Sequence, residues 1–287
     1  MPTLRDIKQR IFGVQKTQTI TRALKMVAAV KLRRAQQAIL QARPYALHLA
    51  EMMGHIASKV DPSLHPLLAV REPHRVCYVI VTADQGLCGS FNQNIIRKAD
   101  AELAQYPDKQ AIDLILIGRK GRDYFVRRNY KVIGEYVQFF KNLQFSQAVD
   151  IANLIQERYV EQKLDRIFLI YNEFKSAAQQ RVVVEQLLPI IPVAPESERY
   201  LSDFIFEPDP ITILNTLCPK NLNVQIWRVL LESFASEMGA RMTAMEYATE
   251  NANKLISELQ MQYNKKRQEG ITKEILEIIS GSEALKA

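Results

Sequence analysis

Apolar residues near the start of the chain recur at spacings of three and four, which is the period of one face of an α-helix. Residues 3–43 contain no proline and only one glycine, Gly13. Pro44 predicts a kink, but the same spacing resumes over residues 45–56, so the helix is predicted to continue to about Lys59. The positions expected to face inward are Leu4, Ile7, Ile11, Val14, Ile20, Leu24, Val27, Leu32, Ala35 and Ile39.

A second helical pattern occupies the end of the chain and has the form of a coiled-coil seam. Apolar or small residues there alternate steps of four and three, which is the heptad repeat of helices that pack along their length. No proline follows Pro219, so this helix is predicted to begin at Pro219 and to end near Ser280, with Gly281 as its C-terminal cap. The predicted seam consists of Met238, Met242, Met245, Thr249, Ala252, Ile256, Leu259 and Tyr263.

Between these helices the pattern changes to short β-branched runs, most of them separated by helical stretches. This alternation predicts an α/β fold with a Rossmann-like, five-stranded, largely parallel sheet. The expected strands cover residues 75–84, 111–118, 130–137, 165–174 and 180–188, and the expected helices cover 92–106, 120–128 and 145–162. The predicted organisation is an N-terminal coiled-coil helix at 1–59, an α/β domain at 75–195 and a C-terminal coiled-coil helix at 210–287. Small seam residues and two long terminal helices favour an antiparallel coiled coil over the alternative, a helical bundle core.

The charge of the chain is concentrated at one end. The net charge is +7, and residues 1–43 hold ten Lys and Arg with Asp6 as their one acid, which leaves 28 basic and 30 acidic residues elsewhere. A local excess of this kind indicates an acidic partner or nucleic acid. The composition is that of a globular protein, three cysteines are too few for a disulfide framework, and no run approaches the roughly 20 apolar residues of a membrane span. We therefore expect a soluble protein of a reducing compartment.

The sequence predicts no catalytic, cofactor or metal site. Two short glycine pairs, at 86–89 and 118–121, follow expected strands, but they lack the order of the dinucleotide and phosphate-binding motifs, which favours structural turns. Cys88 has no evident base, because all four histidines precede the expected sheet. His48 and His55 share a helix face without the further ligands that a metal site needs.

Several segments resemble the gamma subunit of F-type ATP synthases. These segments are VQKTQTITRALKMVAAVKLR at 14–33, GLCG at 86–89, SEMGARMTAM at 236–245, YNKKRQ at 263–268, ITKEI at 271–275 and EIISG at 277–281. The resemblance covers both ends of the chain and the start of the α/β domain, in the same order as in the family.

The resemblance implies a rotor shaft that turns inside a ring of three alpha and three beta subunits, one shaft per ring. It implies contacts with the epsilon subunit and the membrane ring of c subunits, and a delta subunit in the same complex. Torque on the shaft would couple proton flow to ATP synthesis or hydrolysis, with the catalytic residues on the other subunits. The expected location is peripheral, at the cytoplasmic face of a bacterial plasma membrane or, alternatively, the matrix side of a mitochondrial membrane.

The resemblance also implies roles for particular residues. The expected contacts with beta subunits are Arg22, Leu24, Lys25, Met26, Arg241, Arg267 and Gln268. The expected contacts of the α/β end with the c-ring or epsilon are Phe204, Phe206 and Glu207.

Two other classes of function remain as alternatives. A basic coiled-coil arm also occurs in nucleic-acid-binding proteins, but residues 1–43 hold one aromatic residue, Phe12, and no base-reading motif. A small-molecule enzyme would need a set of catalytic residues, such as a nucleophile with a base, and the sequence predicts no such set. The resemblance implies no nucleic-acid partner and no direct membrane insertion.

Overall fold

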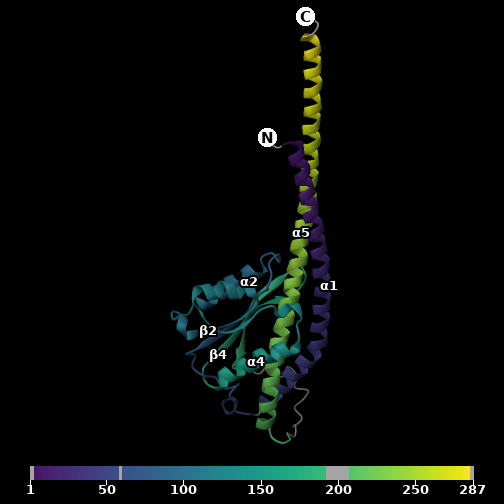
Figure 1. The fold of residues 1–287 in the computed structure, drawn as a ribbon. Helices are drawn as coiled ribbons and strands as arrows, with labels where there is room; N and C mark the ends of the chain where they lie inside the picture. Colours follow the sequence, from purple (N-terminus) through teal and green to yellow (C-terminus); the bar gives the residue numbers. More distant parts are fainter. Residues whose placement is uncertain (1–2, 58–59, 192–206, 285–287) are drawn as a thin grey trace. The chain divides into compact units, whose positions relative to one another are not determined.

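The computed structural model describes residues 3–57, 60–191 and 207–284 of the 287-residue chain. The chain divides into two units. The helical unit contains residues 1–27 and 242–287, and the sheet unit contains residues 28–241. Two long helices, α1 (Leu4–Ala57) and α5 (Pro210–Ala284), contribute residues to both units (Figure 1).

Helix α1 begins at a reciprocal hydrogen-bonded cap. The Asp6 backbone N–H donates to Thr3 Oγ1 at 3.2 Å, and the Thr3 N–H donates to Asp6 Oδ2 at 2.9 Å. These hydrogen bonds lower the pKa of Asp6, first through the Thr3 backbone. Pro44 lies inside the helix, which continues past it to Ala57.

Helix α5 begins earlier than the sequence predicted. Asp209 Oδ1 accepts hydrogen bonds from the backbone N–H groups of Ile211 and Thr212, so Asp209 is the N-cap and Pro210 the first helical residue. The predicted start at Pro219 was wrong. Proline is favoured at the first position of a helix, and the proline that occupies this position is Pro210, directly after the capping Asp209. The predicted cap at Gly281 was also wrong, since the helix runs on to Ala284.

The sheet unit contains a five-stranded sheet with the order β3-β2-β1-β4-β5. The neighbours from β3 to β4 are parallel, and β5 pairs antiparallel with β4. This arrangement confirms the predicted five-stranded, largely parallel sheet. The strands are β1 (Val76–Val81), β2 (Ile112–Ile117), β3 (Lys131–Tyr136), β4 (Arg166–Phe174) and β5 (Gln180–Leu188).

Helices cover both faces of the sheet, and the strands alternate between two cores. Cys77, Val79 and Val81 of β1 point toward one core, which α4 and α5 complete, whereas Val76, Tyr78 and Ile80 point toward a second core with α2. Because both faces are covered, every residue of β1 and β2 is buried. The remaining helices are α2 (Phe91–Leu103), α3 (Arg119–Phe125) and α4 (Phe145–Val160), with short 3₁₀ turns at Pro62–Leu64, Lys109–Ala111, Val126–Arg128 and Phe139–Lys141.

Candidate functional site

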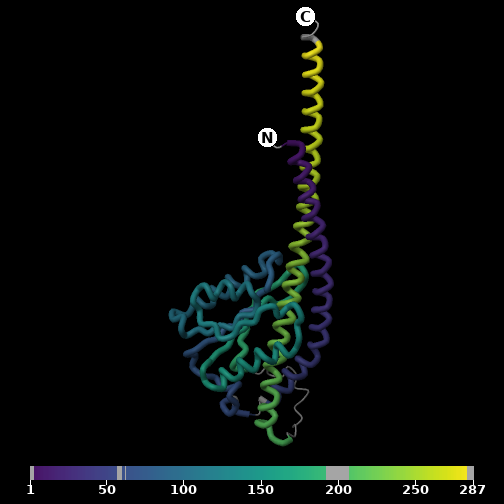
Figure 2. The backbone as a smooth tube through the Cα atoms, in the orientation of Figure 1, coloured from purple at the N-terminus to yellow at the C-terminus, as the bar shows by residue number. Residues whose placement is uncertain are grey.

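In the helical unit, α1 and α5 run antiparallel (Figure 2). Three polar pairs join the two helices. Gln18 donates to Asn253, the hydroxyl oxygens of Thr21 and Thr249 lie 2.7 Å apart, and Lys25 Nζ lies 2.6 Å from Glu246 Oε1. As the residue numbers rise along α1 they fall along α5, which is the geometry of an antiparallel pair. Gln18, Asn253 and Glu246 were not predicted to lie at this contact, because the heptad pattern marks apolar positions and gives no signal for polar pairs.

Most predicted seam residues of the helical unit point inward. Met245, Ala252, Ile256 and Leu259 are buried. Met242, Thr249 and Tyr263 are half-buried. Met238, in the sheet unit, is buried as well.

Two of the positions of α1 that were predicted to face inward, Ile20 and Val27, are exposed instead, while the other eight are buried or half-buried. Ile20 and Val27 are 60% and 52% exposed, whereas Thr21 is buried. Their predicted inward placement was wrong. Thr249 of α5 is a polar partner for Thr21, so the face of α1 that carries Thr21 points toward α5 and Ile20 points away from it. Small and polar residues, rather than the bulkiest ones, therefore form this part of the seam.

Four residues of α1 were predicted to contact a beta subunit, and they differ in how exposed their side chains are. Arg22 and Met26 are exposed, and Leu24 is half-buried. Lys25 is half-buried and pairs with Glu246, so part of its charge is neutralised within the chain. Arg22 and Met26 are the two of these four with the most accessible side chains.

Arg241, also predicted to contact a beta subunit, lies inside the sheet unit. Its Nη1 donates to Glu237 Oε1 at 2.6 Å, and its Nη2 donates to the Gly86 carbonyl oxygen at 3.2 Å. Burial raises the pKa of Glu237, and the charge of Arg241 opposes that rise. The guanidinium thus connects α5 to the turn that follows β1. The pair could have been predicted from the sequence, because Glu237 and Arg241 are four residues apart and so lie on the same face of a helix.

Of the other predicted contact residues, Arg267 and Gln268 lie near the C-terminal end of α5, and Glu207 precedes its first residue. Arg267 and Gln268 are exposed. Beyond them the exposed apolar residues of α5 include Ile271, Ile275, Leu276, Ile278 and Ile279. Glu207 is exposed, while Phe204 and Phe206 lie outside the described residues.

The glycine pairs of the sheet unit serve packing and turn geometry. Gly118 has a φ of +91°, and a Cβ built on it would lie 2.0 Å from the Thr82 carbonyl oxygen. The Gly121 N–H donates to Thr82 Oγ1 at 2.8 Å. Asp84 Oδ1 accepts from the N–H of Arg119 at 3.1 Å, so a carboxylate of the chain itself occupies the start of α3.

The cysteines are buried, and burial raises the pKa of all three thiols, that of Cys218 to about 12. A thiol that stays protonated is a poor nucleophile, which disfavours Cys88 as a catalytic residue. Within the described ranges, no group of three or more His, Cys, Asp or Glu is placed to hold a metal ion. None of the described helices is both long and apolar enough to cross a membrane.

These observations define a class of protein in which the two terminal helices pair antiparallel and an α/β domain is inserted between them in the sequence.

A sequence model of the ATP synthase family matches residues 3–285. An ATP synthase gamma chain from Chlorobaculum parvum is 48% identical over the whole of both chains. One from Prosthecochloris aestuarii is also 48% identical, over 99% of both chains. The chain therefore belongs to the ATP synthase gamma chain family, and it is a subunit of that complex rather than its catalytic chain.

Solved structures agree with this assignment. A chain of the central stalk and c-ring of the Tetrahymena thermophila mitochondrial ATP synthase is 26% identical, with a TM-score of 0.61 over 80% of this chain and 99% of that one. A chain from the Euglena gracilis mitochondrial ATP synthase, at 22% identity, has a TM-score of 0.69 over 98% of this chain and 94% of that one, which shows the shared fold. The predicted family and fold class are confirmed.

Proposed function

We propose that this chain is the central-stalk rotor subunit of an F-type ATP synthase and transmits torque between the c-ring and a hexamer of alpha and beta subunits. The observation that carries the proposal is the 48% identity to a gamma chain over the full length of both proteins. The antiparallel helices support it, because cross-helix pairs such as Thr21 with Thr249 resist sliding of one helix along the other.

The proposed contacts with beta subunits use the exposed charge and apolar surface of the helices. Arg22 and Met26 on α1, with Arg267 and Gln268 on α5, present accessible side chains. The ten basic residues of the first 43 suit an acidic loop on a beta subunit, since opposite charges steer and orient the encounter. Leu24 and Lys25 are proposed to contribute from the edge of this surface. Arg241 is proposed to act indirectly, by holding the turn at Gly86.

The α/β end is proposed to contact the c-ring and the epsilon subunit, with Glu207 as the contact residue within the described ranges. A delta subunit belongs to the same proposed complex. The bacterial relatives support a location at the cytoplasmic face of a bacterial plasma membrane, with this chain attached through its partners. Proton flow through the c-ring would then drive ATP synthesis, and hydrolysis would drive the reverse rotation.

Titration of the purified chain into alpha and beta subunits, with ATP hydrolysis as the readout, tests the proposal. We expect hydrolysis to rise and to saturate at one chain per three alpha and beta pairs, because one shaft fills one ring. The chain alone is the control and should not hydrolyse ATP. Hydrolysis by the chain alone, saturation at another ratio, or salt-resistant sequence-specific RNA binding would contradict the proposal.

A further inference from the structure

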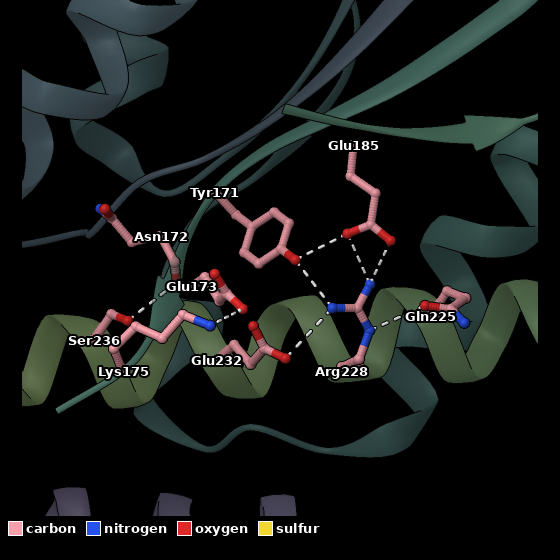
Figure 3. A network of polar contacts seen from close by, with 9 residues as sticks. All are labelled: Tyr171, Asn172, Glu173, Lys175, Glu185, Gln225, Arg228, Glu232 and Ser236. Atoms are coloured by element: carbon pink, nitrogen blue, oxygen red, sulfur yellow. Dashed lines mark hydrogen bonds and ion pairs between the residues drawn. The ribbon is translucent and has the colours of Figure 1, made fainter. Parts of the chain in front are cut away.

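A closed ring of hydrogen bonds fastens α5 to the hairpin of β4 and β5 in the sheet unit (Figure 3). Arg228 Nη2 donates to both carboxylate oxygens of Glu185, at 2.7 and 2.8 Å. Arg228 Nη1 donates to the Tyr171 hydroxyl at 2.9 Å, and that hydroxyl lies 2.9 Å from Glu185 Oε2, to which it donates. One guanidinium therefore holds a residue from each strand of the hairpin.

The rest of the guanidinium is held by α5 itself. Arg228 Nε donates to Gln225 Oε1 at 3.0 Å, and Nη1 also reaches Glu232 Oε1 at 3.3 Å. Tyr171 is 2% exposed, and burial raises the pKa of its hydroxyl, which keeps it protonated as a donor. Because every nitrogen of the guanidinium has a partner, its plane is fixed relative to both the helix and the hairpin.

Two further contacts extend the attachment along α5. Ser236 Oγ donates to the Asn172 carbonyl oxygen at 3.0 Å, and both residues are buried. Gly239 passes so close to the hairpin that an added Cβ would lie 3.2 Å from Ala177 Cα. From Arg228 to Gly239 the attachment covers about 16 Å of helix, at about 1.5 Å per residue.

Next to Arg228, part of the space between α1 and α5 is a cavity. A cavity of about 360 Å³ lies between the two helices, lined by Ile39, Ala42 and Ala46 of α1 and by Val224, Arg228 and Leu231 of α5. The hydrogen bonds described above from Arg228 to residues outside α5 reach the hairpin, at Tyr171 and Glu185.

Resting on the proposed function, we propose that Arg228 is a positioning residue for torque transmission, which locks the α/β domain to α5 through Glu185 and Tyr171. Apolar contacts between a helix and a sheet are non-directional, whereas hydrogen bonds to a charged group fix the orientation of particular side chains. The planar guanidinium of Arg228 holds Glu185 through Nη2 and the Tyr171 hydroxyl through Nη1, so two nitrogens in one fixed plane resist both sliding and rotation. Load applied to the α/β domain then reaches α5, which is continuous to Ala284, with little slip.

The test uses Arg228→Lys in the complete complex, reconstituted in lipid vesicles with its c-ring. Lysine keeps the charge and the apolar stem but loses the planar fork. We expect ATP hydrolysis by the complex of this chain with alpha and beta subunits to stay near the wild-type rate. Proton pumping per ATP hydrolysed should fall by about threefold or more as the attachment slips, because a single ammonium group lacks the rigid plane that holds Glu185 and Tyr171 at once. Arg181→Lys, an exposed arginine on the same β5 strand, is the matched control and should keep the wild-type ratio.

A second variant keeps the proposal testable if Arg228→Lys does not fold. Glu185→Gln keeps the shape and one acceptor, and it should lower the same pumping ratio. When both variants fold, the double variant should show less than the sum of the two effects, because both break one ring. An unchanged pumping ratio in a folded variant overturns the role of Arg228. Failure of the wild-type chain to activate alpha and beta subunits would instead overturn the proposed function.

Discussion

Thr21 and Thr249 face each other across the paired helices, with their hydroxyl oxygens 2.7 Å apart. Each hydroxyl also lies within hydrogen-bond distance of a carbonyl oxygen of its own helix, Gln18 at 3.0 Å and Met245 at 2.7 Å. A polar pair inside an apolar seam fixes the register, because a shift along the helix would bury each hydroxyl against apolar side chains.

Replacing one of these threonines should therefore cost more than replacing both. We expect Thr21→Val and Thr249→Val each to lower the free energy of unfolding by about 1 kcal/mol, and the double variant to be close to neutral, since valine has the shape of threonine. Urea unfolding of the four proteins gives the interaction energy. Additive losses in the double variant would show that the pair contributes nothing specific.

A substitution at Leu259 tests whether the predicted seam is buried further along α5. Leu259 is 4% exposed, and Leu259→Asp should lower the free energy of unfolding by several kcal/mol, because it removes a buried side chain and introduces a charge. Met261→Asp, at a position 65% exposed on the same helix, is the matched control and should change stability little. Equal thermal unfolding temperatures for the two variants would argue against burial of Leu259.

Charge reversal at Arg22 and Lys25 tests the proposed contact with beta subunits. The double variant Arg22→Glu and Lys25→Glu should slow ATP hydrolysis by the reconstituted complex, because like charges would face the acidic loop. Among the described residues, the change replaces the half-exposed pair of Lys25 with Glu246 by two like charges, which should cost about 1 kcal/mol. Circular dichroism checks that the chain stays folded, and full turnover at low salt would speak against the contact.

Gly118 and Gly13 should respond oppositely to alanine. Gly118→Ala places a methyl group against the Thr82 carbonyl in a left-handed backbone conformation, so it should destabilise the sheet unit strongly. Gly13 lies within α1 with no atom within 4 Å of an added Cβ, so Gly13→Ala should stabilise the helix by about 0.5 to 1 kcal/mol. Chemical unfolding of the purified chain measures both, and a stable Gly118→Ala variant would rule out the close approach to Thr82.

His65 should make stability depend on pH. It is buried, its Nδ1 accepts the Leu67 N–H at 3.2 Å, and burial lowers its pKa below the usual 6.5. The unfolded chain then binds the proton more readily, so stability is fully present above about pH 6.5 and is lost as the pH falls toward the lowered pKa. His65→Asn keeps an acceptor without the titration, and it should lose less stability than the wild type between pH 7.5 and 5.5. His48→Asn, at an exposed position, controls for the loss of a histidine, and parallel pH profiles for His65→Asn and wild type would contradict the prediction.

Much of the architecture could be read from local patterns. Spacings of three and four gave both long helices, and β-branched runs gave all five strands, because helix and strand periods depend only on neighbouring residues. The boundaries were less predictable. Pro219 and Pro210 are both compatible with a first helical turn, and only the side-chain hydrogen bonds of Asp209 distinguish them.

The family, the two long terminal helices with an α/β segment between them in the sequence, and the concentration of positive charge near the N-terminus all follow from the amino-acid pattern. Which residues face inward depends on packing, since Ile20 lies exposed while Thr21 meets Thr249. The tertiary structure also shows that Arg241 is paired inside the chain and that Arg228 joins α5 to two strands. These contacts join residues far apart in the sequence, and a hydrogen bond depends on where the folded backbone brings its two partners, which no local period encodes.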